Sequence, residues 1–225
     1  MIIKSCLAGL SIGLGGILYI LMQYLSLKLN ILNLTELFKF IGSCLFSIGL
    51  LIICTFKLNL YTGKIGLILE QKRDVKEYLS LILILIINLI SSGTMGLGCH
   101  YLFNLIEPSF VAIACNITNK RIELNNVNDY VNSFINSCLC GACVYSAVKG
   151  FQRYKLLLTF FISWFVYCGF EHCIADSFYY CFANIFKYKA FISLIINIVG
   201  NTIGVIPVIY AYKIYDNESN SATSV

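Results

Sequence analysis

An acidic and an imidazole side chain stand next to each other between two long apolar runs. Glu171 and His172 belong to the segment G-F-E-H-C-I-A-D, residues 169–176, which separates apolar residues 156–168 from the aromatic run 177–186. An ionisable pair inside membrane-length apolar sequence is costly to bury, so it indicates a functional site such as a proton or ion pathway. Histidine can exchange a proton near neutral pH because its reference pKa is about 6.5. The alternative is a hydrogen-bonded core pair in a soluble protein.

The composition favours a membrane protein over a soluble one. Hydrophobic residues make up 59% of the chain and charged residues 12%, whereas soluble domains carry about 25% charged residues. The first apolar segment, residues 6–27, is too long for the core of a signal peptide, and no cleavage site follows it. The net charge of +5 comes from lysines and arginines in short loops, where they orient a protein in the bilayer. We therefore predict no nucleic-acid partner.

Most of the eleven cysteines lie within apolar segments, where a free cysteine behaves as a small hydrophobic residue. The run Cys138-Leu139-Cys140-Gly141-Ala142-Cys143 has spacings that a metal or redox site could use, but no histidine or carboxylate is close in sequence. We interpret it as a helix-packing segment with small residues and predict no metal and no other cofactor. An accessible pair of Cys140 and Cys143 would instead indicate a membrane thiol oxidoreductase, which cysteine labelling in intact membranes would reveal.

The apolar pattern predicts an all-α membrane protein formed by a single transmembrane domain, residues 1–225. The six expected helices cover about residues 4–27, 37–55, 78–103, 131–148, 156–186 and 190–214. Polar residues interrupt the second helix at 57–64, and residues 169–176 interrupt the fifth. Residues 106–130 are expected to form a long extramembrane loop, and residues 215–225 a disordered tail. Basic loop residues predominate on the side that holds the two termini, which we therefore expect to be cytoplasmic.

The two halves of the chain, about residues 4–105 and 131–214, share short motifs in the same order. Residues 5–9 (SCLAG) match 137–141 (SCLCG), residues 54–57 (CTFK) match 168–171 (CGFE), and residues 88–90 (NLI) match 201–203 (NTI). Three helices in each half would place the halves in opposite orientations, as two inverted three-helix repeats whose second helices are broken. Backbone groups freed at such breaks must line a protein cavity, and half-helix N-termini favour anions. The pattern therefore predicts a midplane site for a small transported solute.

These segments resemble the formate/nitrite transporter family. Residues 169–178 (GFEHCIADSF) are similar to the family motif G-F-E-H-S-I-A-N-M-F. Residues 46–50 and 60–63 resemble its F-S-x-G-L and L-F-T-G around the first break. Residues 200–204 resemble its G-N-I-I-G, and residues 4–15 its L-A-G-x-x-I-x-L-G. The resemblance covers nearly the whole chain apart from residues 106–130.

The resemblance implies a homopentamer in the cell membrane, not an enzyme, with an aquaporin-like pore in every protomer. The substrate would be a small monovalent anion, with formate as the first expectation and nitrite, hydrosulfide or lactate as others, possibly moved with a proton. The pore residues implied by the match are His172, Glu171, Thr62, Asn88 and Asn201. The hydrophobic constrictions implied by the match are Phe46, Leu50, Leu60 and Phe165.

Three departures from the family pattern matter for function. Asn125 stands where an ungapped alignment places a family lysine, and Gly141 stands where the family motif C-N-x-L-V-C has asparagine. Lys57 lies in the first break, where the family has a small residue. One hypothesis is that Lys57 replaces part of the missing positive field; the alternative is that it extends toward water or pairs with a carboxylate. Asn125 and Gly141 also raise the alternative of a degenerate family member with lost or altered transport.

A bare anion loses much hydration energy in a narrow apolar constriction, and a neutral acid loses far less. Our hypothesis is that the anion is drawn toward Thr62 and His172 and protonated there, directly or through water. It would then cross the phenylalanine and leucine constrictions as a neutral acid. Burial lowers a histidine pKa and a charged Glu171 raises it, so channel-like and proton-coupled transport both stay open. The alternative for His172 is a helix-capping residue without a substrate role. His100 has no motif, and we expect a loop or interface role for it.

Overall fold

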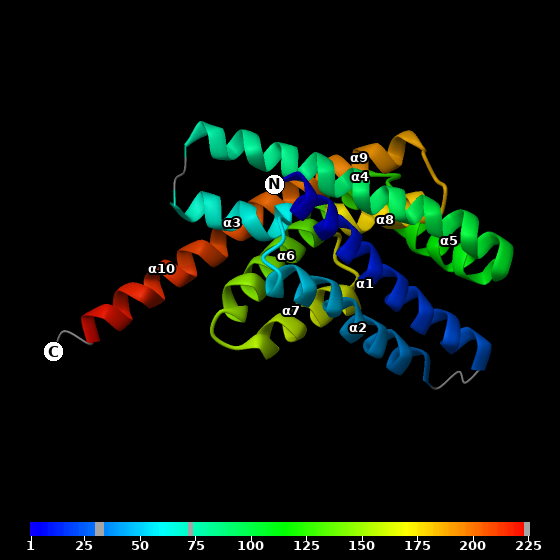
Figure 1. Cartoon of the computed structure of the whole chain (residues 1–225), viewed down its shortest axis with the longest axis horizontal. Coiled ribbons are helices and arrows are strands. Elements are labelled where there is room, and N and C mark those ends of the chain that lie inside the picture. The colour runs from blue at the N-terminus through cyan, green and yellow to red at the C-terminus, as the bar shows by residue number, and fades with distance from the viewer. Residues whose placement is uncertain (30–33, 72–73, 223–225) are drawn as a thin grey trace.

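The structure is a computed structural model that describes residues 1–29, 34–71 and 74–222, with the backbone alone for residues 216–222. Within these ranges all regular structure is helical (Figure 1). The helices are α1 (Ile2–Leu29), α2 (Thr35–Thr55), α3 (Tyr61–Gln71), α4 (Val75–Ile106), α5 (Ser109–Arg121), α6 (Val127–Phe151), α7 (Lys155–Cys168), α8 (Cys173–Phe182), α9 (Tyr188–Ile203) and α10 (Val205–Ala222).

Up to six membrane spans follow from the lengths and apolarity of the described helices. Five helices are long and apolar enough to cross a membrane by themselves: α1, α2, α4, α6 and the run Tyr188–Tyr215 that joins α9 to α10. The pair α7 and α8 adds a sixth span that is bent by 51° at a short break. A span needs about 20 residues at 1.5 Å per residue. The all-helical class and the predicted six passes agree with this arrangement.

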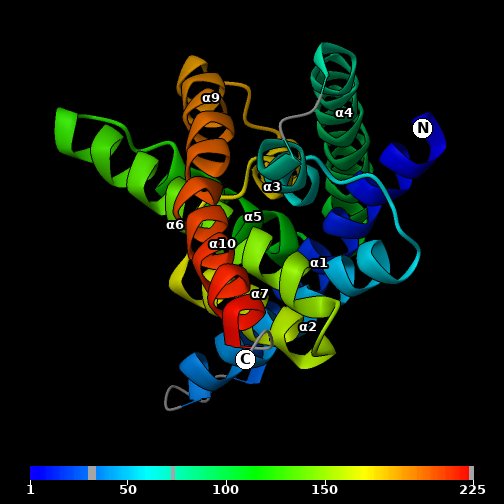
Figure 2. The same cartoon turned by 90° about the vertical axis from the view of Figure 1, so that its left-hand side faces the viewer.

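The bundle consists of two groups of packed helices (Figures 1 and 2). α1 packs against α2 and α4, and α6 packs against α7 and α9; contacts of α2 with α7 and of α4 with α8 join the groups. Glycines allow the closest helix crossings. Gly9 of α1 lies against the carbonyl oxygen of Asn88 on α4, and Gly141 of α6 lies against that of Asn201 on α9, so that an added Cβ would overlap the oxygen in both places.

The structure corrects the prediction of a long loop over residues 106–130. Residues 109–121 form α5, which packs on α8 and α1. Its buried face contains Phe110, Ile113, Ala114 and Thr118, at the spacing of one helix face. The polar residues that suggested a loop lie on the remaining faces and at the C-terminal end of the helix. α5 therefore belongs to the wall of the bundle and places its last residues, Lys120 and Arg121, beside the other helices.

The C-terminal segment continues the last helix in this structure. α10 continues to Ala222 and projects away from the bundle (Figure 1), although residues 215–225 were predicted to be disordered. Extending an existing helix costs much less than nucleating a new one, so a polar segment can continue an apolar helix. Residues 223–225 lie outside the described residues.

The corner between α4 and α5 is fixed by Glu107. Its carboxylate accepts hydrogen bonds from the hydroxyl groups of Ser109 at 2.8 Å and Tyr24 at 2.9 Å. The hydrogen bond from Ser109 and, to a smaller extent, the one from Tyr24 hold the pKa of Glu107 below its usual range. The corner thus ties the start of α5 to α1, and this orients α5 toward the bundle.

The close α6–α9 crossing generates a prediction about stability. We expect Gly141→Ala to destabilise the protein by about 1–3 kcal/mol, because the new methyl group overlaps the carbonyl oxygen of Asn201 and the helices must separate. Thermal unfolding of the purified protein in detergent measures this. Gly98→Ala on α4 is the control, since an added Cβ there meets nothing within 4 Å. Equal melting temperatures for the two variants would contradict the packing role of Gly141.

Candidate functional site

Two helix breaks use the same turn. Lys57 after α2 and Gly169 after α7 both have left-handed backbone conformations, with φ values of 51° and 78°. In each turn, this residue donates to the carbonyl three positions earlier, and the next residue donates to the carbonyl five positions earlier. The shared hydrogen-bond pattern makes Lys57 of the first turn equivalent to Gly169 of the second. The sequence match of residues 54–57 with 168–171, which aligned Lys57 with Glu171, is therefore shifted by two residues.

A buried asparagine holds the first break. Asn88 of α4 is fully buried, and its Oδ1 accepts the N–H of Tyr61, the first residue of α3, at 2.9 Å. Its Nδ2 donates to the carbonyl of Asn59 at 3.0 Å and to that of Ser5 on α1 at 2.7 Å. One amide thus satisfies a donor and an acceptor freed by the break and links them to α1.

The second break has the same arrangement. Asn201 of α9 is fully buried, and its Oδ1 accepts the N–H of Cys173, the first residue of α8, at 3.0 Å. Its Nδ2 donates to the carbonyl of Glu171 at 2.9 Å and to that of Ser137 on α6 at 2.8 Å. Backbone groups at membrane depth have no water to replace such bonds, so each asparagine makes its break tolerable.

His172 joins the two broken helices. It is the N-cap residue of α8, and its Nδ1 accepts the N–H of Ala175 at 3.2 Å. Its Nε2 lies 2.9 Å from Oγ1 of Thr62, in the first turn of α3. Because Nδ1 accepts a hydrogen bond, the proton of the neutral ring is assigned to Nε2, which donates to Thr62. Helix capping, the alternative role predicted for His172, therefore accounts for Nδ1 alone. Nε2 points toward α3 and has no part in the cap.

A cavity of about 530 Å³ leads from the ends of α1, α2 and α5 to His172. Phe46 and Phe165 line it next to the histidine, with their ring centroids 5.9 Å apart in an edge-to-face arrangement. The ring of Phe165 also stacks on the imidazole, with centroids 6.0 Å apart. The lining also includes polar and charged residues of α1, α2, α5 and α6: Gln23, Ser26, Thr35, Glu36, Lys39, Asn116, Lys120 and Asn136.

The remaining residues implied by the family match lie at various distances from this cavity. Glu171 lines it, is 6% exposed and accepts a hydrogen bond from Ser133 Oγ at 2.8 Å. Leu50 and Leu60 are buried in the core and are not part of the cavity lining. Thr62 lies behind the imidazole, and Lys57 is exposed at the first break and outside the lining.

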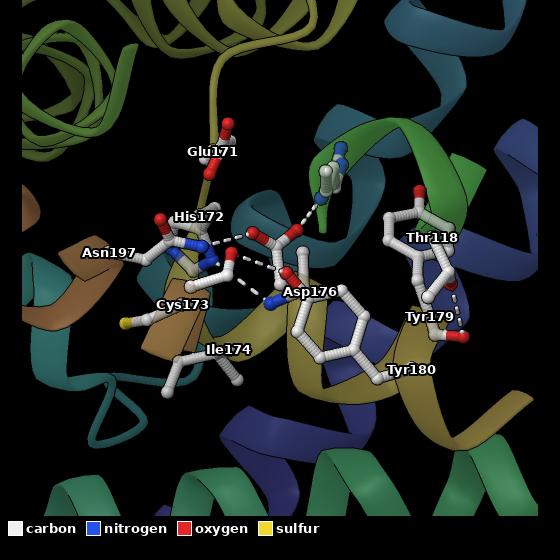
Figure 3. A network of polar contacts seen from close by, with 12 residues as sticks. Thr118, Glu171, His172, Cys173, Ile174, Asp176, Tyr179, Tyr180 and Asn197 are labelled. Carbon is white, nitrogen blue, oxygen red and sulfur yellow. Dashed lines mark hydrogen bonds and ion pairs between the residues drawn. The ribbon is translucent and has the colours of Figure 1, made fainter. Parts of the chain in front are cut away.

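An ion pair that the sequence did not suggest lies next to the histidine. Arg121 of α5 pairs with Asp176 of α8. Asp176 is fully buried, and Figure 3 shows it close to His172 and Asn197. The other carboxylate oxygen of Asp176 accepts a hydrogen bond from Asn197 Nδ2 at 2.6 Å, and Asn197 Oδ1 lies 2.8 Å from Ser137 Oγ. Asp176 could have been suspected because it stands where the family motif has asparagine. Arg121 could not, because it lay in the predicted loop.

Two of the three departures from the family pattern, Asn125 and Gly141, have different surroundings. Asn125 is exposed and lines a second cavity of about 430 Å³, and its side chain accepts a hydrogen bond from Lys189 Nζ at 2.8 Å. Gly141 lies at the tight α6–α9 crossing, which has no room for an asparagine side chain. Cys140 and Cys143 are free cysteines, and Cys140 is fully buried within α6. This burial disfavours the alternative of a thiol oxidoreductase, which requires an accessible cysteine pair.

The comparisons with known proteins agree with the geometry. Residues 1–215 match the formate/nitrite transporter family. A structure described as a pentameric formate channel with formate bound superposes with a TM-score of 0.72, at 16% identity, over 95% of this chain and 96% of that chain. A structure described as an FNT family ion channel gives a TM-score of 0.72, at 18% identity, over 95% and 89% of the two chains. No protein of curated function matches the sequence.

The asparagine that holds the second break can be tested by an isosteric change. Asn201→Asp replaces the amide that donates to the carbonyls of Ser137 and Glu171 by a carboxylate that cannot donate. We expect it to destabilise the protein by about 1–3 kcal/mol for each of these two carbonyls. Thermal unfolding in detergent measures the loss, and Asn104→Asp at an exposed position of α4 controls for the added charge. Unchanged stability of Asn201→Asp would show that the break does not depend on this amide.

The left-handed conformation of Lys57 leads to a prediction with two readouts. Lys57→Gly should stabilise the protein by about 1 kcal/mol, since a residue with a Cβ is strained in this region. Lys57→Met removes the same charge without relieving the strain and should give no such gain. Thermal unfolding compares the two variants. Anion flux through both variants then tests the charge separately: an equal decrease in both would support Lys57 as a source of positive field.

Proposed function

Because the chain belongs to the formate/nitrite transporter family, we propose that it transports a small monovalent anion through a pore in each protomer of a homopentamer. The similar fold of a pentameric channel with formate bound supports this proposal and makes formate the first anion to test. Nitrite, hydrosulfide and lactate are the other candidates. The protein would lie in the cell membrane with both termini cytoplasmic, and its two halves would form inverted repeats around an aquaporin-like pore.

One observation carries the proposal. The N-terminal ends of α3 and α8 come together at the hydrogen bond between Thr62 and His172. Helix N-termini carry partial positive charge, so two of them at one buried point favour a negative charge there. The cavity connects this point to the end of the bundle where α1 ends and α2 begins. An anion could therefore approach the imidazole from that side without crossing lipid.

The aromatic residues beside the histidine determine which form of the substrate can continue. Phe46 and Phe165 border the cavity next to His172, and the buried Leu50 and Leu60 belong to the apolar core nearby. A charged species is strongly disfavoured in such apolar surroundings, and a neutral acid is disfavoured much less. We propose that the imidazole of His172 first takes up a proton from solvent in the cavity and then gives a proton to the anion. The ring returns to its neutral form, and the neutral acid passes these side chains.

The geometry of His172 sets a condition on that proton transfer. A charged imidazole carries protons on both nitrogens, but Nδ1 accepts the N–H of Ala175 in this structure. Charging the ring therefore requires the cap bond of α8 to break, whereas the neutral ring can offer only the Nε2 proton as a hydrogen bond. The protonation step would thus be coupled to a small movement at the start of α8.

We expect His172→Asn to lower formate flux into proteoliposomes at least about tenfold, because it removes the group that protonates the anion. Wild-type flux should change across pH 5 to 8, and the variant should lose most of that pH response. Asparagine is a good N-cap residue, so the variant keeps the start of α8. The matched control is His100→Asn, because His100 contacts the Phe182 carbonyl and does not line the cavity.

Flux of nitrite, hydrosulfide and lactate would be measured in the same proteoliposomes. Equal formate flux and equal pH response in wild type and His172→Asn would exclude a role of the imidazole. Absence of flux for all four anions, from protein shown to be an assembled oligomer, would contradict transport and favour a degenerate family member.

A further inference from the structure

Arg121 places a guanidinium group between the two cavities. It lines the cavity that reaches His172 and also the second cavity, in both cases together with Glu171. Its side chain is 16% exposed, and its charge centre lies 4.9 Å from the centre of the Tyr179 ring. An arginine so deeply enclosed requires a partner for its charge, and Asp176 is that partner.

The ion pair uses only part of the guanidinium group. Nη1 of Arg121 contacts Oδ1 of Asp176, while Oδ2 of Asp176 is engaged by Asn197. A guanidinium group has five N–H donors in a fixed plane. Within the described part of the chain, Asp176 is its one ion-pair partner. Further donors on the same group are therefore available to an anion in the adjoining cavity.

The charges around this point do not favour an anion without Arg121. Several ionisable residues share the lining of the first cavity with Arg121: Tyr19, Glu36, Lys39, Lys120, Glu171, His172 and Tyr179. The second cavity adds Glu123 and Asp129. Of the two lysines, Lys39 is half-buried and Lys120 is exposed, so neither lies as deep as Arg121. Asp176 adds a second carboxylate to that of Glu171, immediately behind. Two carboxylates near a neutral imidazole would repel an anion, so the guanidinium is the group that can offset them at this depth.

We propose that Arg121 recognises the transported anion and selects anions with two oxygen atoms in one plane. A guanidinium pairs with carboxylate or nitrite through two parallel hydrogen bonds, which a hydrosulfide cannot form. The inference rests on the proposed function and narrows its substrates to formate, nitrite and lactate over hydrosulfide. Asp176, held by Asn197, acts as a positioning residue that fixes the plane of the guanidinium.

The test separates the shape of the guanidinium from its charge. Arg121→Lys keeps the charge and loses the planar pair of donors, and we expect the ratio of formate to hydrosulfide flux to fall at least about tenfold. Asp176→Asn keeps a hydrogen-bond acceptor for Arg121 and removes one negative charge, so both fluxes should rise while their ratio changes little. Asp74→Asn, at an exposed aspartate outside both cavities, controls for the loss of a negative charge.

Binding is measured independently of flux, by saturation transfer from the detergent-solubilised protein to the formate proton in NMR. We expect the wild-type signal to fall at least about fivefold in Arg121→Lys, since the bidentate contact is lost. Should Arg121→Lys not assemble, the double variant R121Q/D176N tests the guanidinium group as a whole, because it removes this group and its buried counter-charge together; the same loss of signal, at least about fivefold, is expected.

The two readouts distinguish the two proposals. Wild-type flux with a formate-to-hydrosulfide ratio that Arg121→Lys does not change would overturn the role of Arg121 and leave transport in place. A formate signal that depends on Arg121, without flux of any anion, would support recognition and overturn transport. Neither signal nor flux in the wild type would overturn both.

Discussion

The fold depends on the hydrogen bonds that allow a helix to break at membrane depth. Each break exposes backbone N–H and C=O groups that lipid cannot satisfy. Asn88 and Asn201 supply one acceptor and two donors each, and both bind the first N–H of the half-helix that follows. The glycines at positions 9 and 141 let α1 and α6 approach the helices that carry these asparagines. The position of His172 follows from this construction, because the residue stands directly before α8.

This construction links the chemistry of the site to its structure. The imidazole uses Nδ1 to cap α8 and Nε2 to contact Thr62 of α3. A change in its protonation therefore alters either the cap or the contact between the half-helices. A histidine on a regular helix would titrate without such a consequence. The broken helix gives one side chain two fixed partners, and a substrate that reaches it must compete with one of them.

The sequence was sufficient for the parts of the fold that long apolar runs determine. The spans and the two breaks followed from interruptions of apolar sequence by polar residues. The pore roles of Asn88, Asn201 and His172 were implied by the family resemblance and stay predictions. α5 was missed because asparagine, lysine and arginine residues interrupt its apolar residues, so the segment lacks a long apolar run. The sequence match of the two breaks was off by two residues. It paired identical residue types, whereas the backbone conformation pairs Lys57 with Gly169, since both have positive φ values.

The ion pair of Arg121 with Asp176 shows why α5 matters beyond packing. A buried ion pair contributes little net stability, since the loss of hydration offsets most of its attraction. Apolar residues at both positions would hold α5 against α8 at least as well. The pair instead places a cation in the lining of the cavity that ends at His172, and its hydrogen-bonded carboxylate partner is buried outside that lining. The loss of hydration of this pair has a functional explanation if the guanidinium binds the anion in that cavity. Arg121, which would give α5 this role, is also one of the polar residues that made the segment resemble a loop.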